Sequence, residues 1–109
     1  MKKSKTEFYK DAGYIIDTLN KLSNINVLEN RRTRDLSETR SVLYTVFRSK
    51  YDVTLKSIRD YMKECGKSSD HATIIYSINN FEIYARFSDL ALKDWRDKLI
   101  YKINTNTLR

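Results

Sequence analysis

The chain has 109 residues and a formal net charge of +7, which is enough sequence for one hydrophobic core and too little for two. Hydrophobic residues make up 40% and charged residues 32%, a composition too apolar for a disordered chain. The lack of proline and the presence of only two glycines argue against a β-sandwich or barrel, and a single cysteine excludes an internal disulfide. We therefore expect one all-α domain over residues 1–109, with five to six helices and with frayed ends at 1–5 and 104–109.

The sequence gives no sign of a membrane segment or an export signal. No apolar run approaches the roughly 20 residues of a bilayer span, and no apolar stretch follows the basic amino terminus. A lone thiol, Cys65, is typical of a reducing compartment. We therefore expect a cytoplasmic protein that does not associate with a membrane.

The first half of the chain predicts three helices and a basic loop. Apolar residues three and four positions apart predict a helix over residues 6–22. Ser23 or Asn24 then caps a short helix to about residue 30. The segment 31–35 reads Arg-Arg-Thr-Arg-Asp and predicts a basic loop, after which Ser37 is the expected N-cap of the next helix.

The second half predicts a helix-turn-helix followed by a last helix. Thr54 is a good N-cap for a helix that Gly66 should end in a left-handed conformation. A second helix should run from Asp70 to about residue 85, and Ser88 should cap the last one. Two helices joined by this short turn form the central helix-turn-helix of the predicted fold.

The positive charge is concentrated in one part of the chain. Between Arg31 and Lys67 there are ten basic and five acidic residues, whereas from Asp70 onward six basic residues face five acidic ones. A positive field over part of a small domain attracts polyanions, of which nucleic acid is the usual one. A solvated charge run with no partner is the alternative explanation.

The start of the second helix of the pair has the residue types of a DNA-reading helix. Asp70, His71, Ala72 and Thr73 are small or polar, and the apolar stripe begins only at Ile74. A recognition helix needs this division, because its first turn enters a groove while its later turns stay packed on the domain. Arginines in a loop beside such a helix can reach the minor groove.

Three short motifs occur at defined distances from one another. Arg31-Arg32-Thr33-Arg34 is followed, six residues after its last arginine, by Arg40. The element Leu55-Lys56-Ser57-Ile58 begins fifteen residues later, and Asp70-His71-Ala72-Thr73-Ile74 opens the second helix of the pair.

With these motifs, residues 18–103 resemble the DNA-binding carboxy-terminal domain (domain IV) of the bacterial replication initiator DnaA. That family has Arg-Arg-Ser-Arg, Leu-Pro-x-Ile and Asp-His-(Ser/Thr/Ala)-Thr-(Val/Ile) at the corresponding places. This chain departs from the pattern at Lys56 in place of proline, at Arg59 in place of glycine, and at Ser69 in place of arginine. Its turn before Asp70 is also about four residues longer.

The resemblance implies sequence-specific binding to a DnaA-box-like site in double-stranded DNA. It implies that the basic loop enters the minor groove through Arg32 and that the recognition helix reads the major groove. Base-edge contacts would set the sequence preference, and phosphate contacts would set affinity and register. The DNA-binding residues expected on this basis are Arg31, Arg32, Arg34, Arg40, Arg48, Leu55, Lys56, Lys67, Ser69, Asp70, His71, Ala72 and Thr73.

The expected function is regulation of replication or transcription without catalysis. The sequence has no Gly-x-x-x-x-Gly-Lys-Ser/Thr motif for an ATPase, and a single histidine, His71, cannot form a multi-histidine metal site. We therefore expect no enzyme activity, no cofactor and no metal, and a nucleoid-associated protein that meets DNA and, as a further partner, a replication protein or the full-length initiator. The alternative is a protein-interaction module whose basic face binds an acidic protein.

Overall fold

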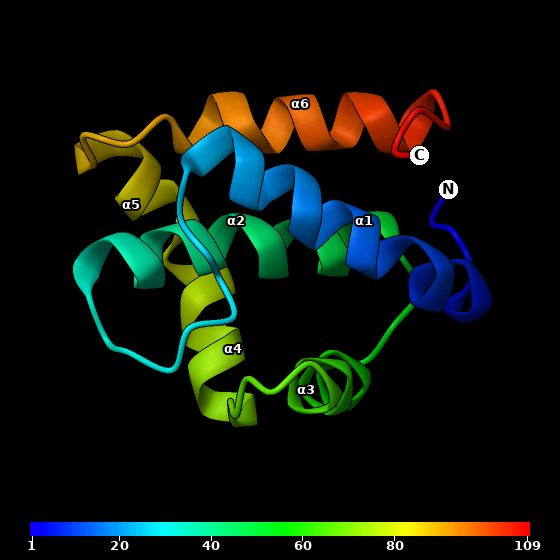
Figure 1. Cartoon of the computed structure of the whole chain (residues 1–109), viewed down its shortest axis with the longest axis horizontal. Coiled ribbons are helices and arrows are strands. Elements are labelled where there is room, and N and C mark those ends of the chain that lie inside the picture. The colour runs from blue at the N-terminus through cyan, green and yellow to red at the C-terminus, as the bar shows by residue number, and fades with distance from the viewer.

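A computed structural model describes all residues, 1–109, as six helices without a strand (Figure 1). This architecture confirms the expected all-α fold of five to six helices. The helices are α1 (Lys5–Ser23), α2 (Arg34–Lys50), α3 (Leu55–Glu64), α4 (His71–Asn79), α5 (Phe81–Phe87) and α6 (Leu92–Asn104).

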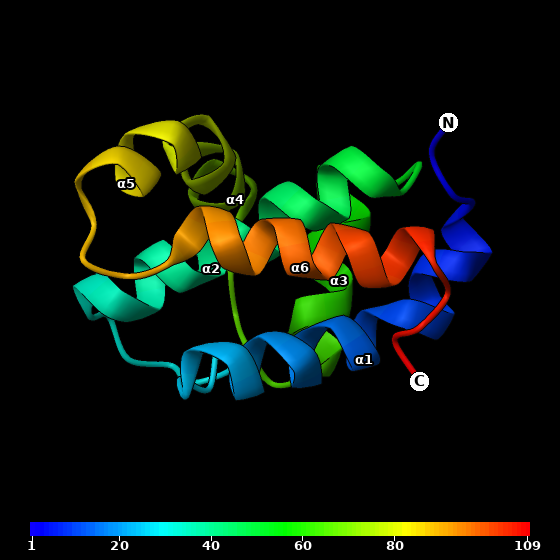
Figure 2. The same ribbon diagram turned by 90° about the horizontal axis from the view of Figure 1, so that it is seen from above.

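Helix α2 is the centre of the fold, because it contacts each of the other five helices. Figures 1 and 2 show α1 and α6 passing on one side of it, while α4 and α3 lie on the other. Phe8 of α1 packs edge-on against Phe47 of α2, with ring centroids 4.9 Å apart. A pair of this kind contributes roughly 0.5–1.5 kcal/mol beyond the area that it buries.

The helix predicted from Ser23 or Asn24 to about residue 30 is wrong. Asn24 has a φ of 57° and ends α1 in the left-handed region. The following backbone groups find side-chain partners instead of helical ones: Asn20 Oδ1 accepts the Val27 N–H at 3.0 Å, and Asn26 Oδ1 accepts the Leu28 N–H at 3.1 Å. These bonds stabilise an irregular segment that buries Val27.

Helix α2 begins earlier than predicted. Its N-cap is Thr33, whose Oγ1 accepts the Leu36 N–H at 3.2 Å, and not Ser37. Both residues are good caps, but only an earlier start brings Leu36 into the buried face of the helix. Arg34 is therefore the first residue of α2 and not part of the loop.

The helix-turn-helix is formed by α3 and α4, which pack against each other. Thr54 caps α3 as predicted, accepting the Ser57 N–H at 3.1 Å. Gly66 has a φ of 91°, and a Schellman motif closes the helix through a 2.9 Å bond from Lys67 N–H to the Met62 carbonyl.

The region after α4 differs from the prediction in two places. The expected helix from Asp70 to residue 85 is interrupted at Asn80, whose side chain donates to the Tyr76 carbonyl at 2.8 Å, so that α4 and α5 are separate. Ser88 does not cap α6. Its hydroxyl instead donates to the buried carboxylate of Glu38 at 2.7 Å and accepts the Leu90 N–H, which ties the α5–α6 connection to α2.

The segment that precedes α1 contacts both the end of α2 and the carboxy-terminal segment, although the two chain ends themselves lie on opposite sides of α6 in Figure 2. The backbone of Lys3 bonds to Lys50 and Asp52, and its Nζ donates to Asn106 at 2.9 Å. None of the six helices combines the length and the apolar character that a bilayer span requires.

Alanine substitutions at the two glycines should have opposite effects on the free energy of unfolding. Gly66→Ala places a Cβ at a positive φ and should lower the free energy of unfolding by about 1 kcal/mol. Gly13→Ala lies inside α1, where a Cβ meets only Tyr61 Oη at 3.5 Å, and should raise that free energy by about 0.5–1 kcal/mol. Urea unfolding of both variants measures this, and equal effects would contradict the assigned turn.

Candidate nucleic-acid interface

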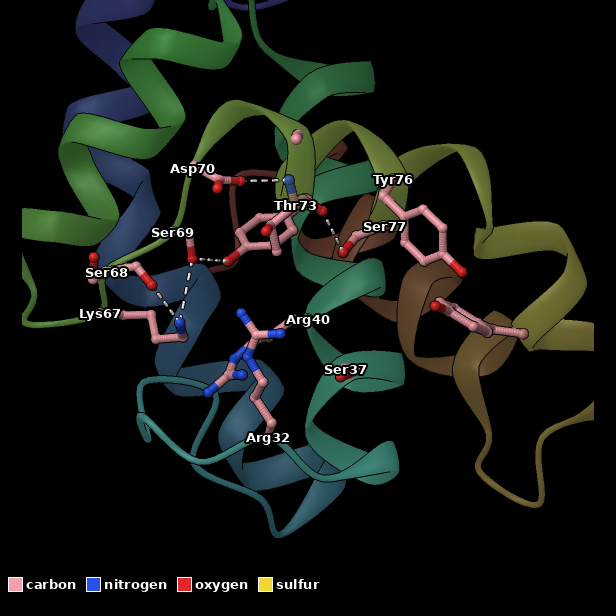
Figure 3. Close-up of a pocket in the computed structure, with 13 residues that line it drawn as sticks. Arg32, Ser37, Arg40, Lys67, Ser68, Ser69, Asp70, Thr73, Tyr76 and Ser77 are labelled. Carbon is pink, nitrogen blue, oxygen red and sulfur yellow. Dashed lines mark hydrogen bonds between the residues drawn. The ribbon is translucent and has the colours of Figure 1, made fainter.

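A polar cavity of about 600 Å³ lies between the basic loop, α2 and the start of α4 (Figure 3). Its walls include Arg32 from the loop and Thr73 from the first turn of α4, so these two motifs share one surface. The predicted site residues that line it are Arg32, Arg40, Lys67, Ser69, Asp70, Ala72 and Thr73.

Arg40 anchors the loop to the central helix. Its side chain is buried, with only 6% of the residue exposed, and it reaches across from α2 to three backbone carbonyls. The guanidinium donates to Val27 at 2.8 Å, to Arg31 at 3.3 Å, and to Glu29. These bonds fix the course of the irregular segment that carries Arg32.

The environment of Arg40 differs from that of a phosphate ligand on the surface. Burial lowers the pKa of its guanidinium, which nonetheless stays charged because an arginine starts so far above neutral pH. A guanidinium has five N–H groups, and three are engaged with carbonyls. The resemblance implied a direct contact with DNA, whereas the geometry gives Arg40 the position of an organising residue.

Lys67 is the third cation at the cavity. Its Nζ donates to the Ser68 carbonyl at 2.6 Å and lies 3.4 Å from Ser69 Oγ. Burial, followed by the nearby charges of Arg40 and Arg32, lowers the pKa of Lys67. Three like charges therefore influence one another here, and an anion in the cavity would relieve that repulsion.

Asp70 is the carboxylate among the lining residues, and it works as the N-cap of α4. Its Oδ1 accepts the Thr73 N–H at 2.7 Å. This hydrogen bond, with a smaller contribution from Arg32, holds the pKa of the carboxyl below its ordinary value. Beyond the cap, the side chains of His71, Ala72 and Thr73 are exposed, while Ile74 is buried and fixes the helix to the core.

Six predicted site residues do not line the cavity, and one of them, His71, is the exposed first residue of α4. Arg31 and Arg34 flank Arg32 and are exposed, and they pair with Glu29 at 2.7 Å and with Glu38 at 3.3 Å. The other three lie near the end of α2 and the start of α3: Arg48 donates to the Val53 carbonyl, Lys56 pairs with Asp60, and Leu55 packs against the core.

Sequence reasoning missed the aromatic part of the cavity. Tyr44, Tyr76 and Tyr84 line it, although no tyrosine was among the predicted site residues. Helical spacing could have indicated Tyr76, because it follows Ala72 by four residues and Thr73 by three and so lies on the same face of the helix. Ser37, Ser68 and Ser77 complete the lining.

No protein-family model, curated protein or solved structure matches this chain. No group of three or more His, Cys, Asp or Glu side chains lies where it could hold a metal ion.

Replacing Arg40 should release the basic loop. Arg40→Ala leaves three carbonyls without their donor and should lower the free energy of unfolding by about 2 kcal/mol. Under native conditions trypsin should cut after Arg31 and Arg32 faster than in the wild type. Arg86→Ala removes an exposed arginine from α5 and serves as the control. Unchanged cleavage in Arg40→Ala would contradict the anchoring role.

The cap at Asp70 predicts a pH dependence of stability. Because its pKa is lowered in the fold, the charged carboxylate stabilises the protein fully above its ordinary pKa of 3.8 and loses this effect as the pH falls through the lowered value. Asp70→Asn keeps a capping side chain without the charge. The difference in unfolding free energy between the two proteins should therefore shrink on acidification from about pH 6 to about pH 3. A constant difference in urea unfolding would contradict this.

Proposed function

We propose that this chain binds double-stranded DNA in a sequence-specific manner and does so without catalysis. One observation carries the proposal: Arg32 of the basic loop and Thr73 of the first turn of α4 line the same cavity. A loop that reaches the minor groove and a helix that enters the neighbouring major groove must share one surface to act on one duplex. The resemblance to DnaA domain IV in the same motifs supports the proposal from the sequence.

In this proposal α4 is the recognition helix. Its exposed first turn presents His71, Ala72 and Thr73 to base edges, and the methyl groups of Ala72 and Thr73 suit contact with thymine. The free backbone N–H groups and the positive dipole at this end favour a nearby phosphate. Helix α3 packs against α4 and supports its orientation.

The basic loop supplies the second contact. Arg32 is exposed and makes no ion pair, so its guanidinium is free to enter the minor groove. Arg31 and Arg34 bind phosphates on either side by exchanging Glu29 and Glu38 for DNA oxygens. Arg48 and Lys56 extend the phosphate contacts toward α3, while Arg40 positions the loop from beneath.

The proposed role is control of replication or transcription at initiator-type sites, in the cytoplasm and near the nucleoid. The sequence lacks the phosphate-binding motif of an ATPase, so binding alone would produce the effect. The chain would then compete with the full-length initiator or hold a replication protein at the site.

A protein partner is a second candidate, favoured by one observation. Ile83 and Phe87 stand four residues apart on α5 and are 56% and 69% exposed. Exposed aromatic and aliphatic side chains on one helix are typical of protein contacts. Loss of specific DNA binding would leave a protein partner that contacts α5 as the better-supported candidate.

Selection from a random duplex pool tests the proposal. The wild type should enrich one motif, and Arg32→Ala and Thr73→Ala should each weaken binding to the selected duplex by about 1–3 kcal/mol, since each loses a groove contact. With about six to eight phosphate contacts, affinity should also fall by orders of magnitude between about 50 and 200 mM salt.

Lys63→Ala is the matched control, because it removes an exposed charge of α3 that does not line the cavity. It should preserve the selected motif and the preference for it. The proposed DNA binding would be refuted if Arg32→Ala and Thr73→Ala both kept the wild-type preference for the selected motif, or if binding did not respond to salt.

A further inference from the structure

The cavity has two chemically different parts. Arg32, Arg40 and Lys67 lie together on the side of the loop, and Tyr76 lies across the cavity beyond Ser77 (Figure 3). Tyr84 lines the cavity too, and burial and then the neighbouring Tyr76 raise its pKa. Positive charge therefore gathers at one end of the cavity and aromatic surface at the other.

A duplex on the outer surface does not account for both parts. Arg40 lines the cavity but is only 6% exposed, so a phosphate of a duplex that stays on the outer surface has little access to it. The bases of a duplex are also stacked and paired, so that their faces cannot meet Tyr76. A ligand that uses the whole cavity needs an accessible anionic group and a free aromatic face.

We propose that this cavity binds a nucleotide, with its phosphate among Arg32, Arg40 and Lys67 and its base stacked on Tyr76. The volume of about 600 Å³ lies within the usual range for small-molecule sites, roughly 300–1,000 Å³. Arg40 keeps N–H groups beyond the three that bind the loop, and Ser69 Oγ lies beside Lys67 Nζ. Tyr76 is 60% exposed, which leaves its ring open for stacking.

The nucleotide would regulate the proposed DNA binding. Arg32 belongs both to the cavity and to the loop that reaches the minor groove, so a bound phosphate and a duplex compete for it. This competition rests on the proposed function, whereas nucleotide binding itself does not.

Isothermal titration of the whole chain with AMP, inorganic phosphate and adenosine, without DNA, tests the proposal. AMP should bind at least tenfold more tightly than either of the others, because only AMP reaches both ends of the cavity. Equal affinity for AMP and phosphate would overturn the aromatic part of the site, and no binding of AMP at millimolar concentration would overturn the site altogether.

Variants locate the two ends. Lys67→Ala and Tyr76→Ala should each weaken AMP binding by roughly tenfold, and Tyr76→Phe should retain it because the ring remains. Lys63→Ala and Tyr101→Ala remove an exposed lysine and a 67%-exposed tyrosine elsewhere and should have no effect. Equal losses in the cavity variants and in these controls would contradict the assigned site.

The two proposals fail in different ways. If AMP binds but no duplex motif is selected, the proposed function fails and the nucleotide site stands. If a motif is selected and AMP neither binds nor displaces the duplex, the nucleotide site fails alone.

Discussion

The bonds from Arg40 to the carbonyls of Val27, Glu29 and Arg31 are the interaction on which the candidate site depends. The segment that carries these carbonyls has no helix or strand to hold it, and backbone freedom costs about 1–2 kcal/mol for each residue that is ordered. One guanidinium on the central helix α2 replaces that missing secondary structure. Since the Arg31 carbonyl is one of its acceptors, the next residue, Arg32, is held beside the cavity and not left on a free loop.

The same arrangement explains why the cavity is charged. Anchoring the loop through Arg40 places a buried cation near Arg32, and the Schellman turn at Gly66 brings in Lys67 from the other side. Asp70, which caps α4, is one carboxylate against these three cations, so the cavity keeps an excess of positive charge. Repulsion among like charges in a cavity lowers the stability of a fold. An anionic partner that binds there would offset this repulsion.

Local features of the sequence predicted local features of the fold. Thr54 and Gly66 act at the positions expected, because a cap and a left-handed turn depend on a few neighbouring residues. The short helix after Asn24 and the unbroken helix through Asn80 were wrong, because amide side chains satisfied the backbone in ways that apolar spacing does not reveal. The sequence offered two equally good N-caps for α2, Thr33 and Ser37, and only the burial of Leu36 in the structure decides for Thr33.

For the site, the order of motifs indicated Arg32 and Thr73, but the anchoring role of Arg40 connects residues 9 to 13 positions apart and needed coordinates. Tyr44 and Tyr84 could not be placed for the same reason.

We propose that the basic loop and the start of α4 engage one duplex together. Backbone amide chemical shifts, followed during titration with a selected duplex, test it most directly. We expect the amide signals of residues 31–34 and 70–73 to shift together at one stoichiometry, and those of Ile83 and Phe87 on α5 to stay unchanged. Shifts confined to one of the two segments, or centred on α5, would contradict it.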